Sequence, residues 1–187
     1  QAGSHRYADA SMVSRQAGHY LENAGIVGRK PQFDLITGAL KKFAEGQSQL
    51  LIIDGAPGMG KTSFLSTIHR NLEKTKLNTL RINGSVQESF RPYYLASHMA
   101  IKLMNFREDK GIGVLEAMDE KEVAFLSQII PQLEAGPIQM PQNDEQYRDT
   151  IFKSFARLFI TLTENRPLAV LVDDLHYCDP ASLHLIR

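Results

Sequence analysis

The fold is decided by the stretch Gly55-Ala56-Pro57-Gly58-Met59-Gly60-Lys61-Thr62. It matches the pattern G-x-x-x-x-G-K-S/T at every fixed position, which is typical of loops that bind nucleotide phosphates. The apolar run Leu50–Ile53, followed by Asp54, comes just before it and predicts a buried strand. After it, apolar residues recur at the spacing of an amphipathic helix: Phe64, Leu65, Ile68 and Leu72. Strand, glycine-rich loop and helix form the context that the pattern needs.

The residue types of this loop suit an anionic ligand. Consecutive main-chain N–H groups and the positive end of a helix dipole supply hydrogen-bond donors to a phosphate, and glycine permits the close approach. We expect Lys61 to reach the β- and γ-phosphates as a catalytic residue, and the Thr62 hydroxyl to ligate Mg²⁺. The predicted phosphate cradle comprises Gly55, Ala56, Pro57, Gly58, Met59, Gly60, Lys61, Thr62 and Ser63. The alternative is a glycine-rich turn without a ligand.

The composition is that of an ordinary soluble globular domain. The 187 residues suffice for one domain with a core, 43% of them are hydrophobic and 22% are charged. The formal net charge is zero, which does not favour direct nucleic-acid binding. A single cysteine excludes an internal disulfide and fits a reducing compartment. Since no apolar run approaches membrane-spanning length, we expect a cytoplasmic protein without a membrane partner.

A second motif lies at Leu168–Asp174, where five apolar residues precede two aspartates. The run predicts a strand buried on both faces, as in a parallel sheet, with its acids at the carboxyl end where such sheets bind ligands. This is the Walker B pattern. Asp173 is predicted to hold Mg²⁺ through water, and Asp174 to polarise the attacking water. The alternative, a pair of solvated loop acids, is disfavoured by the phosphate loop upstream.

Hydrophobic spacing predicts the remaining elements. A helix is expected from Pro31, a strand at Leu77–Asn83 closed by Gly84, and a helix from Pro92. Two further helical faces are predicted, one at Val123, Leu126, Ile130 and Leu133, and one at Tyr147, Ile151, Phe155, Leu158 and Leu162. Residues 105–118 and 135–144 are expected to be connections. The alternation of strands and helices predicts an α/β domain.

The run from Asp173 to Leu183 carries a family resemblance. It reads D-D-L-H-Y-C-D-P-A-S-L and closely resembles the D-D-L-H-W-A-D-P-A-S-L signature of STAND-class ATPases of the AAA-16 type, with Tyr177 and Cys178 replacing the usual Trp and Ala. Val27-Gly28-Arg29 and Pro92-Tyr93 also fall where this family has such residues. The resemblance covers about residues 25–187.

The resemblance implies a three-layer P-loop NTPase fold that binds ATP with Mg²⁺ and hydrolyses it. It implies that Val27, Gly28 and Arg29 lie beside the adenine, which usually meets main-chain groups. It also implies a switch module in a multidomain signalling protein, of the kind that accompanies cyclase, kinase, LuxR-type and maltose-activator-type regulators. The implied partners are ATP, ADP and the other domains, with self-association of the ATP-bound form.

The sequence is expected to consist of two segments. Residues 1–24 are interpreted as a tag remnant and a linker helix, with a faint resemblance of Tyr7–Gly18 to the last helix of diguanylate cyclase domains. Residues 25–187 are interpreted as the ATPase core, truncated after Walker B, because the family's next strand, sensor residue and helical lid are not in the sequence. We therefore expect hydrolysis in a longer parent protein more than in this stretch alone.

Two other functions compete with an ATPase. One is a non-catalytic protein-interaction scaffold, which would bind nucleotide tightly or not at all and would not hydrolyse it. The other is a small-molecule kinase, which would use the same loop but fits the acidic pair less well. His176 is expected to pack behind the acids, with a phosphate contact as the alternative. Cys178 has no accompanying His/Asp arrangement for nucleophilic catalysis, so we expect a buried or half-buried thiol.

Overall fold

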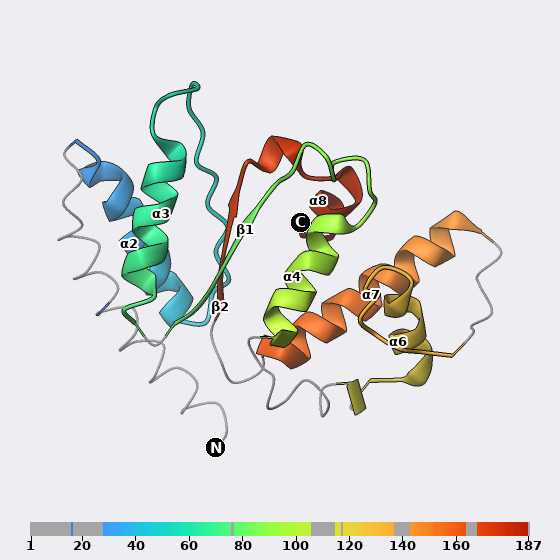
Figure 1. Cartoon of the computed structure of the whole chain (residues 1–187). Helices are drawn as coiled ribbons and strands as arrows, with labels where there is room; N and C mark the ends of the chain where they lie inside the picture. The colour runs from blue at the N-terminus through green and yellow to red at the C-terminus, as the bar shows by residue number, and fades with distance from the viewer. Residues whose placement is uncertain are drawn as a thin grey trace, which may run out of the picture. The chain divides into compact units, whose positions relative to one another are not determined.

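The computed structural model describes residue 16 and residues 28–75, 77–105, 115–116, 118–136, 143–163 and 168–186. The protein is mixed α/β with parallel strands, as predicted. The elements in chain order are α2 (Lys30–Ala44), α3 (Lys61–Leu72), β1 (Asn78–Asn83), α4 (Tyr94–Asn105), α6 (Glu120–Ser127), α7 (Asp144–Thr163), β2 (Leu168–Asp173), the 3₁₀ turn η1 (Leu175–Tyr177) and α8 (Pro180–Ile186) (Figure 1). None of the described helices is long and apolar enough to cross a membrane.

The chain divides into two compact units. The first comprises Gln1–Arg81 with Asn165–Leu171, and the second comprises Ile82–Glu164 with Val172–Arg187. Strands β1 and β2 pair with each other, and each begins in the first unit and ends in the second. The phosphate loop therefore belongs to the first unit and the acidic pair to the second.

The core of the first unit forms between α2 and α3. Both helices were predicted from their apolar spacing. A proline lies in the first turn of α2, where the main-chain N–H groups have no acceptor within the helix, so the missing N–H of proline costs no hydrogen bond. The rings of Phe33 and Phe64 meet at a centroid distance of 4.9 Å. The buried cluster comprises Phe33, Ile36, Phe64, Ile68, Leu72, Leu77 and Leu171, with Leu40, Phe43, Leu65 and Ala169 packed against it.

The run Leu50–Ile53 does not form the predicted buried strand. These residues have no regular secondary structure, and the exposed fractions of the four side chains are 72%, 50%, 76% and 36%. A strand exists only when a neighbour completes its hydrogen-bond ladder. Among the described residues the sheet holds β1 and β2 alone, so nothing pairs with this run. The prediction was therefore wrong about both structure and burial.

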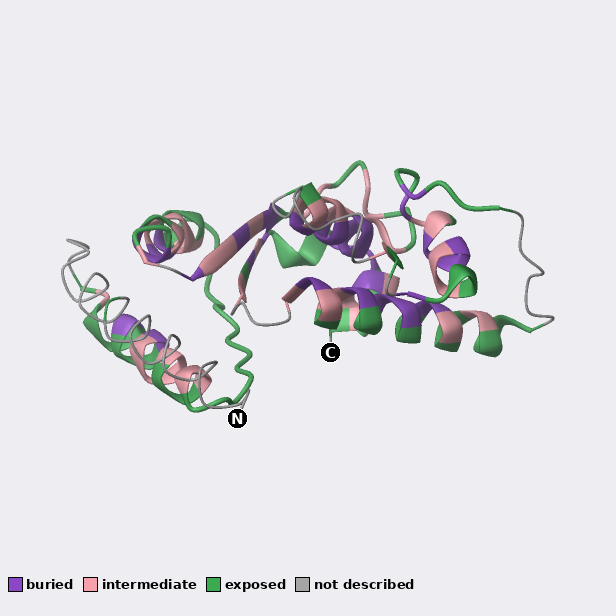
Figure 2. Cartoon of the chain, turned by 90° about the horizontal axis from the view of Figure 1, so that it is seen from below, coloured by how far each residue is buried: buried purple, intermediate pink, exposed green. Residues whose placement is uncertain are grey.

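The helices of the second unit differ in exposure: α7 is buried on one face and exposed on the other (Figure 2), whereas in α4 only the last residue, Asn105, is exposed. Helix α7 confirms the predicted stripe, and its buried residues are Ile151, Ser154, Phe155, Leu158 and Leu162. It packs against α6 and α4, and α4 also packs against α8. Helix α6 ends at Ser127, before the last two residues of the predicted apolar face. These two residues, Ile130 and Leu133, are nevertheless buried.

Strand β2 was predicted at the correct residues, but not with the correct burial. Leu171 and Asp173 are buried, whereas Val170 is 37% exposed. A strand is covered on both faces only when helices lie on both sides of a wider sheet. Several expectations lie outside the described residues: most of residues 1–24, Val27, and the connections at 106–114 and 137–142.

Candidate nucleotide-binding site

The phosphate loop runs into the start of α3, as the sequence predicted. Gly58 has a φ of +80° and Gly60, the N-cap of the helix, a φ of +73°. Both angles lie in the left-handed region, where side chains are disfavoured. A Cβ on Gly58 would meet no atom within 4 Å, and every residue from Gly55 to Gly60 is exposed. The loop is therefore open to a ligand.

Lys61 points its ammonium group back to the loop. Its Nζ donates to the carbonyl oxygen of Gly55 at 2.6 Å and to that of Ala56 at 3.1 Å. The N-terminus of α3 has no side-chain cap and no acidic residue in its first turn. Its dipole is therefore not neutralised locally, and together with the lysine it favours an anion here. These residues fit a nucleotide phosphate.

Arg29 braces the same loop from the segment that precedes α2. Its guanidinium donates a hydrogen bond to the carbonyl oxygen of Met59 and lies 5.6 Å from the centroid of the Phe64 ring. Gly28, just before it, has a φ of +82°. The structure thus brings Arg29 to the loop through its side chain, whereas this residue was expected beside the adenine.

The remaining candidates of the first unit lie in the first turn of α3. Thr62 and Ser63 are both exposed there. Within the described residues there is no group of three or more His, Cys, Asp or Glu side chains that could hold a metal. Mg²⁺ uses few protein ligands and takes the rest from phosphates and water. A threonine hydroxyl and an aspartate, as predicted for Thr62 and Asp173, are suitable ligand types.

The two acids of the second unit differ in environment. Asp173 ends β2 and is buried, and its Oδ1 accepts a hydrogen bond from the amide of Asp174 at 3.1 Å. Asp174 is exposed and has a φ of +53°. Left-handed backbone at a residue other than glycine is uncommon, and it concentrates at functional sites. The exposed acid is therefore the one with access to a reacting group.

Gly84 holds the end of β1 against this acidic pair. Its amide donates to the carbonyl oxygen of Asp173 at 2.9 Å. A Cβ at this position would lie 2.2 Å from the carbonyl oxygen of Asp174 and 3.2 Å from the Sγ of Cys178. Only glycine permits so close an approach. Sequence reasoning treated Gly84 as the end of a strand and missed this role.

Of the two predictions for the side chains after the acidic pair, the one for His176 was wrong and the one for Cys178 is confirmed. All three residues of η1 are exposed, and the His176 ring lies 3.9 Å from that of Tyr177. His176 does not pack behind the acids, because the short 3₁₀ turn carries its side chains outward. Cys178 is buried, as expected. Burial, aided by the carboxylates of Asp179 and Asp174, raises the pKa of its thiol to about 11, so it is a protonated and poor nucleophile at neutral pH.

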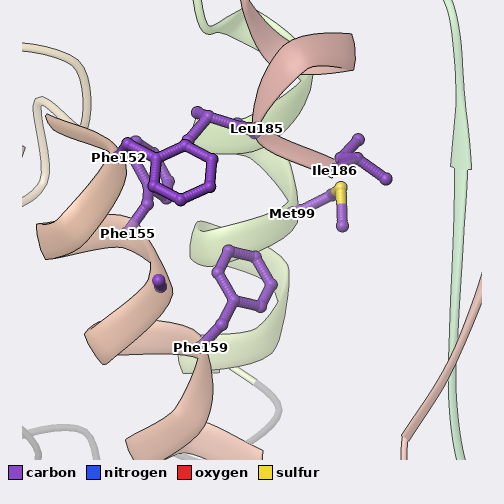
Figure 3. A pocket seen from close by; sticks show the side chains of 8 residues that line it. Met99, Phe152, Phe155, Phe159, Leu185 and Ile186 are labelled. Carbon is purple, nitrogen blue, oxygen red and sulfur yellow. The ribbon is translucent and has the colours of Figure 1, made fainter. Parts of the chain in front are cut away.

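An apolar groove in the second unit does not serve as a phosphate site. It has a volume of about 190 Å³ and lies between residues of α4, α7 and α8. Phe152, Phe155 and Phe159 line it together with Met99, Leu185 and Ile186 (Figure 3). Its lining includes no polar side chain, so it lacks the donors that an anion needs.

Comparison with known proteins identifies the family. Residues 25–187 match the model of the AAA ATPase domain (AAA-16). The chain belongs to this AAA ATPase family. The hybrid signal transduction histidine kinase G of Dictyostelium discoideum is 26% identical in an alignment that covers 90% of this chain. The chain spans only 5% of that protein's length. No solved structure matches the chain. Membership of the AAA ATPase family implies ATP binding, typically with Mg²⁺.

Proposed function

We propose that this AAA ATPase domain is a STAND-type module that binds and hydrolyses ATP and acts as a switch in a multidomain signalling protein of the cytoplasm. The observation that carries the proposal is the position of Lys61. Its ammonium group lies against the carbonyls of a G-x-x-x-x-G-K-T loop, at a helix N-terminus without a cap or an acidic neighbour. A phosphate that enters the loop exchanges those carbonyl contacts for an ion pair.

The residues have separate tasks in this proposal. Main-chain amides of Gly55–Ser63 bind the phosphates, Lys61 reaches the β- and γ-phosphates, and Val27, Gly28 and Arg29 bind the adenosine part. Thr62 and Asp173 hold Mg²⁺, which neutralises phosphate charge when bound. Asp174 orients and polarises the attacking water. Catalysis of this kind depends mainly on positioning and charge stabilisation.

The signalling role is supported by the relative of this chain, whose name describes it as a hybrid signal transduction histidine kinase. We propose that residues 25–187 form the core of the switch and that residues 1–24 link it to a neighbouring part. In the STAND class, exchange of ADP for ATP opens the module and promotes self-association. Other domains of the same protein are the proposed partners.

The proposal is tested by phosphate release from Mg-ATP in the protein at its full natural length, compared with Asp174→Asn. Asparagine tolerates the left-handed backbone of Asp174 and has nearly the same shape, so the substitution removes the charge and one acceptor oxygen with little change in geometry. We expect unchanged ATP affinity and turnover lowered by about 100-fold. Asp149→Asn, at an exposed position of α7 in the same unit, is the control with expected wild-type turnover.

Two results would change the assignment. Normal turnover in Asp174→Asn would remove this residue from its role toward water. A wild-type protein that binds ATP tightly but releases no phosphate would identify the non-catalytic scaffold instead.

A further inference from the structure

One buried carboxylate serves the N-termini of two helices in the second unit. Asp179 is 2% exposed, and its Oδ1 accepts hydrogen bonds from the amides of Tyr93 and Ser182, each at 2.8 Å. Its Oδ2 accepts from the amide of Leu95 at 3.1 Å. The hydroxyl of Ser182, which is fully buried, accepts from the amide of Ala96 at 3.0 Å. We call these two side chains and the amides that they bind the Asp179 clamp.

The clamp supplies side-chain hydrogen-bond acceptors for the first amides of α4, which the residue just before that helix does not provide. The first amides of a helix need acceptors, and Ser, Thr, Asp or Asn usually provides one at the N-cap. The residue before α4 is Tyr93, which has no such group. Its acceptor comes instead from Asp179, 86 residues further along the chain. The same carboxylate also caps α8, which begins at Pro180, through the amide of Ser182.

Two strained residues lie on the segments that the clamp joins. Within the described part of the chain, the residues other than glycine that have a positive φ are Tyr93, at +62°, and Asp174, at +53°. Such conformations persist only where the surrounding contacts over-determine them. The clamp binds the amide of Tyr93 directly. For a residue as bulky as tyrosine, this contact is a structural reason for the left-handed backbone.

The clamp also fixes the turn that carries Asp174. The carbonyl oxygen of Asp174 accepts from the amide of Tyr177 at 2.9 Å, and that of Leu175 accepts from the amide of Cys178 at 3.1 Å. These bonds close a tight turn over Asp174–Cys178, and Asp179 follows this turn directly in the chain. The turn is therefore anchored at one end by β2 and at the other by the clamp.

We propose that Asp179 is a positioning residue for ATP hydrolysis. It anchors the turn Asp174–Cys178 so that the exposed carboxylate of Asp174 keeps a single orientation toward its water. This inference rests on the proposed role of Asp174 in hydrolysis. Asp179 itself is buried and acts through the turn, not by touching the nucleotide.

Asp179→Asn is the appropriate variant, because it keeps the shape of the side chain. One oxygen remains for two of the three amides, while the new NH₂ group faces the third. We expect turnover of Mg-ATP to fall by about 10- to 100-fold, since small displacements of a catalytic group have effects of this size. The ATP concentration at half-saturation should stay within about twofold, because no residue of the phosphate loop belongs to the clamp.

A matched control separates positioning from general stability. Asp119→Ala removes an ordinary N-cap from α6 in the same unit and contacts no residue of the clamp. Turnover is measured well below the melting temperature of each variant and is expressed per folded molecule. We expect the wild-type rate for Asp119→Ala and a slow rate for Asp179→Asn.

The outcomes are distinct. Wild-type turnover in Asp179→Asn, or an equal loss in Asp119→Ala, would overturn the positioning role while leaving the ATPase intact. A wild-type protein without phosphate release would overturn the proposed function itself and this inference with it. If Asp179→Asn does not fold, Asp179→Ser decides, because serine keeps an N-cap acceptor for α8 but removes the carboxylate that binds the amides of Tyr93 and Leu95. We expect turnover to fall by about 10-fold, and an unchanged rate would overturn the proposal.

Discussion

The amide of Gly84 lies 2.9 Å from the carbonyl oxygen of Asp173, so the end of β1 is hydrogen-bonded to the residue that ends β2. The same approach leaves no room for a Cβ, which would lie 2.2 Å from the carbonyl oxygen of Asp174. The backbone of the acidic pair is thus held by a residue that has no side chain. The acidic pair can lie this close to the end of β1 only because position 84 carries no Cβ.

Gly84→Ala should destabilise the second unit by about 3 kcal/mol or more, because the added methyl group meets backbone atoms that have little freedom to move. Gly38→Ala is the matched control. Gly38 lies inside α2, and its Cβ would meet no atom within 4 Å, so alanine should raise stability by up to about 1 kcal/mol. Urea unfolding monitored by circular dichroism measures both changes. Equal stability of the two variants would contradict the close approach at Gly84.

Lys61→Ala should abolish the stabilisation of the protein by ATP. For a ligand at a hundredfold excess over its dissociation constant, that stabilisation is about 2.7 kcal/mol in the wild type. Thermal unfolding with and without Mg-ATP measures it. Lys41→Ala, at an exposed position near the end of α2, removes the same charge elsewhere in the same unit and should keep the full shift. A full shift in Lys61→Ala would show that the ligand does not use this loop.

Stability should fall at alkaline pH because of Cys178. Burial, then Asp179 and Asp174, raise the pKa of its thiol from about 9 to about 11 in the folded protein. The unfolded chain therefore loses this proton first, and the free energy of unfolding decreases between about pH 9 and pH 11. Cys178→Ala, which introduces the usual residue of the STAND signature, should show a shallower decline. Parallel pH profiles for the two proteins would refute the raised pKa.

Asp119→Ala should cost about 1 kcal/mol of stability. The Asp119 side chain accepts from the amide of Lys121 at 2.8 Å, and the Glu122 carboxylate accepts from the amide of Asp119 at 3.1 Å, which completes a capping box. Asp119→Asn retains an acceptor and should cost much less. Urea unfolding midpoints compare them, and indistinguishable midpoints for Ala and Asn would argue against the cap.

Much of the fold could be predicted because its signals are local. The spacing of apolar residues located α2, α3, α4, α7 and both strands, and the loop motif located Lys61 at the start of α3. A glycine pattern followed by an amphipathic stripe specifies loop and helix with no information from distant residues.

The parts that could not be predicted depend on residues far apart in sequence. The cap of α4 comes from Asp179, and no local pattern at Tyr93 indicates that partner. The clearance at Gly84 exists only because β1 and β2 pair. At Leu50–Ile53 the local pattern predicted a strand, but the described sheet consists of β1 and β2, so this run has no strand to pair with there. Hydrophobicity predicts a tendency to pair, whereas the partner is a property of the whole fold.

The exposed run Leu50–Ile53 has a practical consequence for solubility. An exposed apolar segment with a strand-forming sequence is a template on which further chains can add edge to edge, and this leads to aggregation. Association should therefore increase with protein concentration, as light scattering would record. Ile52 is 76% exposed, so Ile52→Lys should suppress association at little cost to the fold. The segment just before the phosphate loop is thus also a place where a single added charge should help to keep the protein in solution.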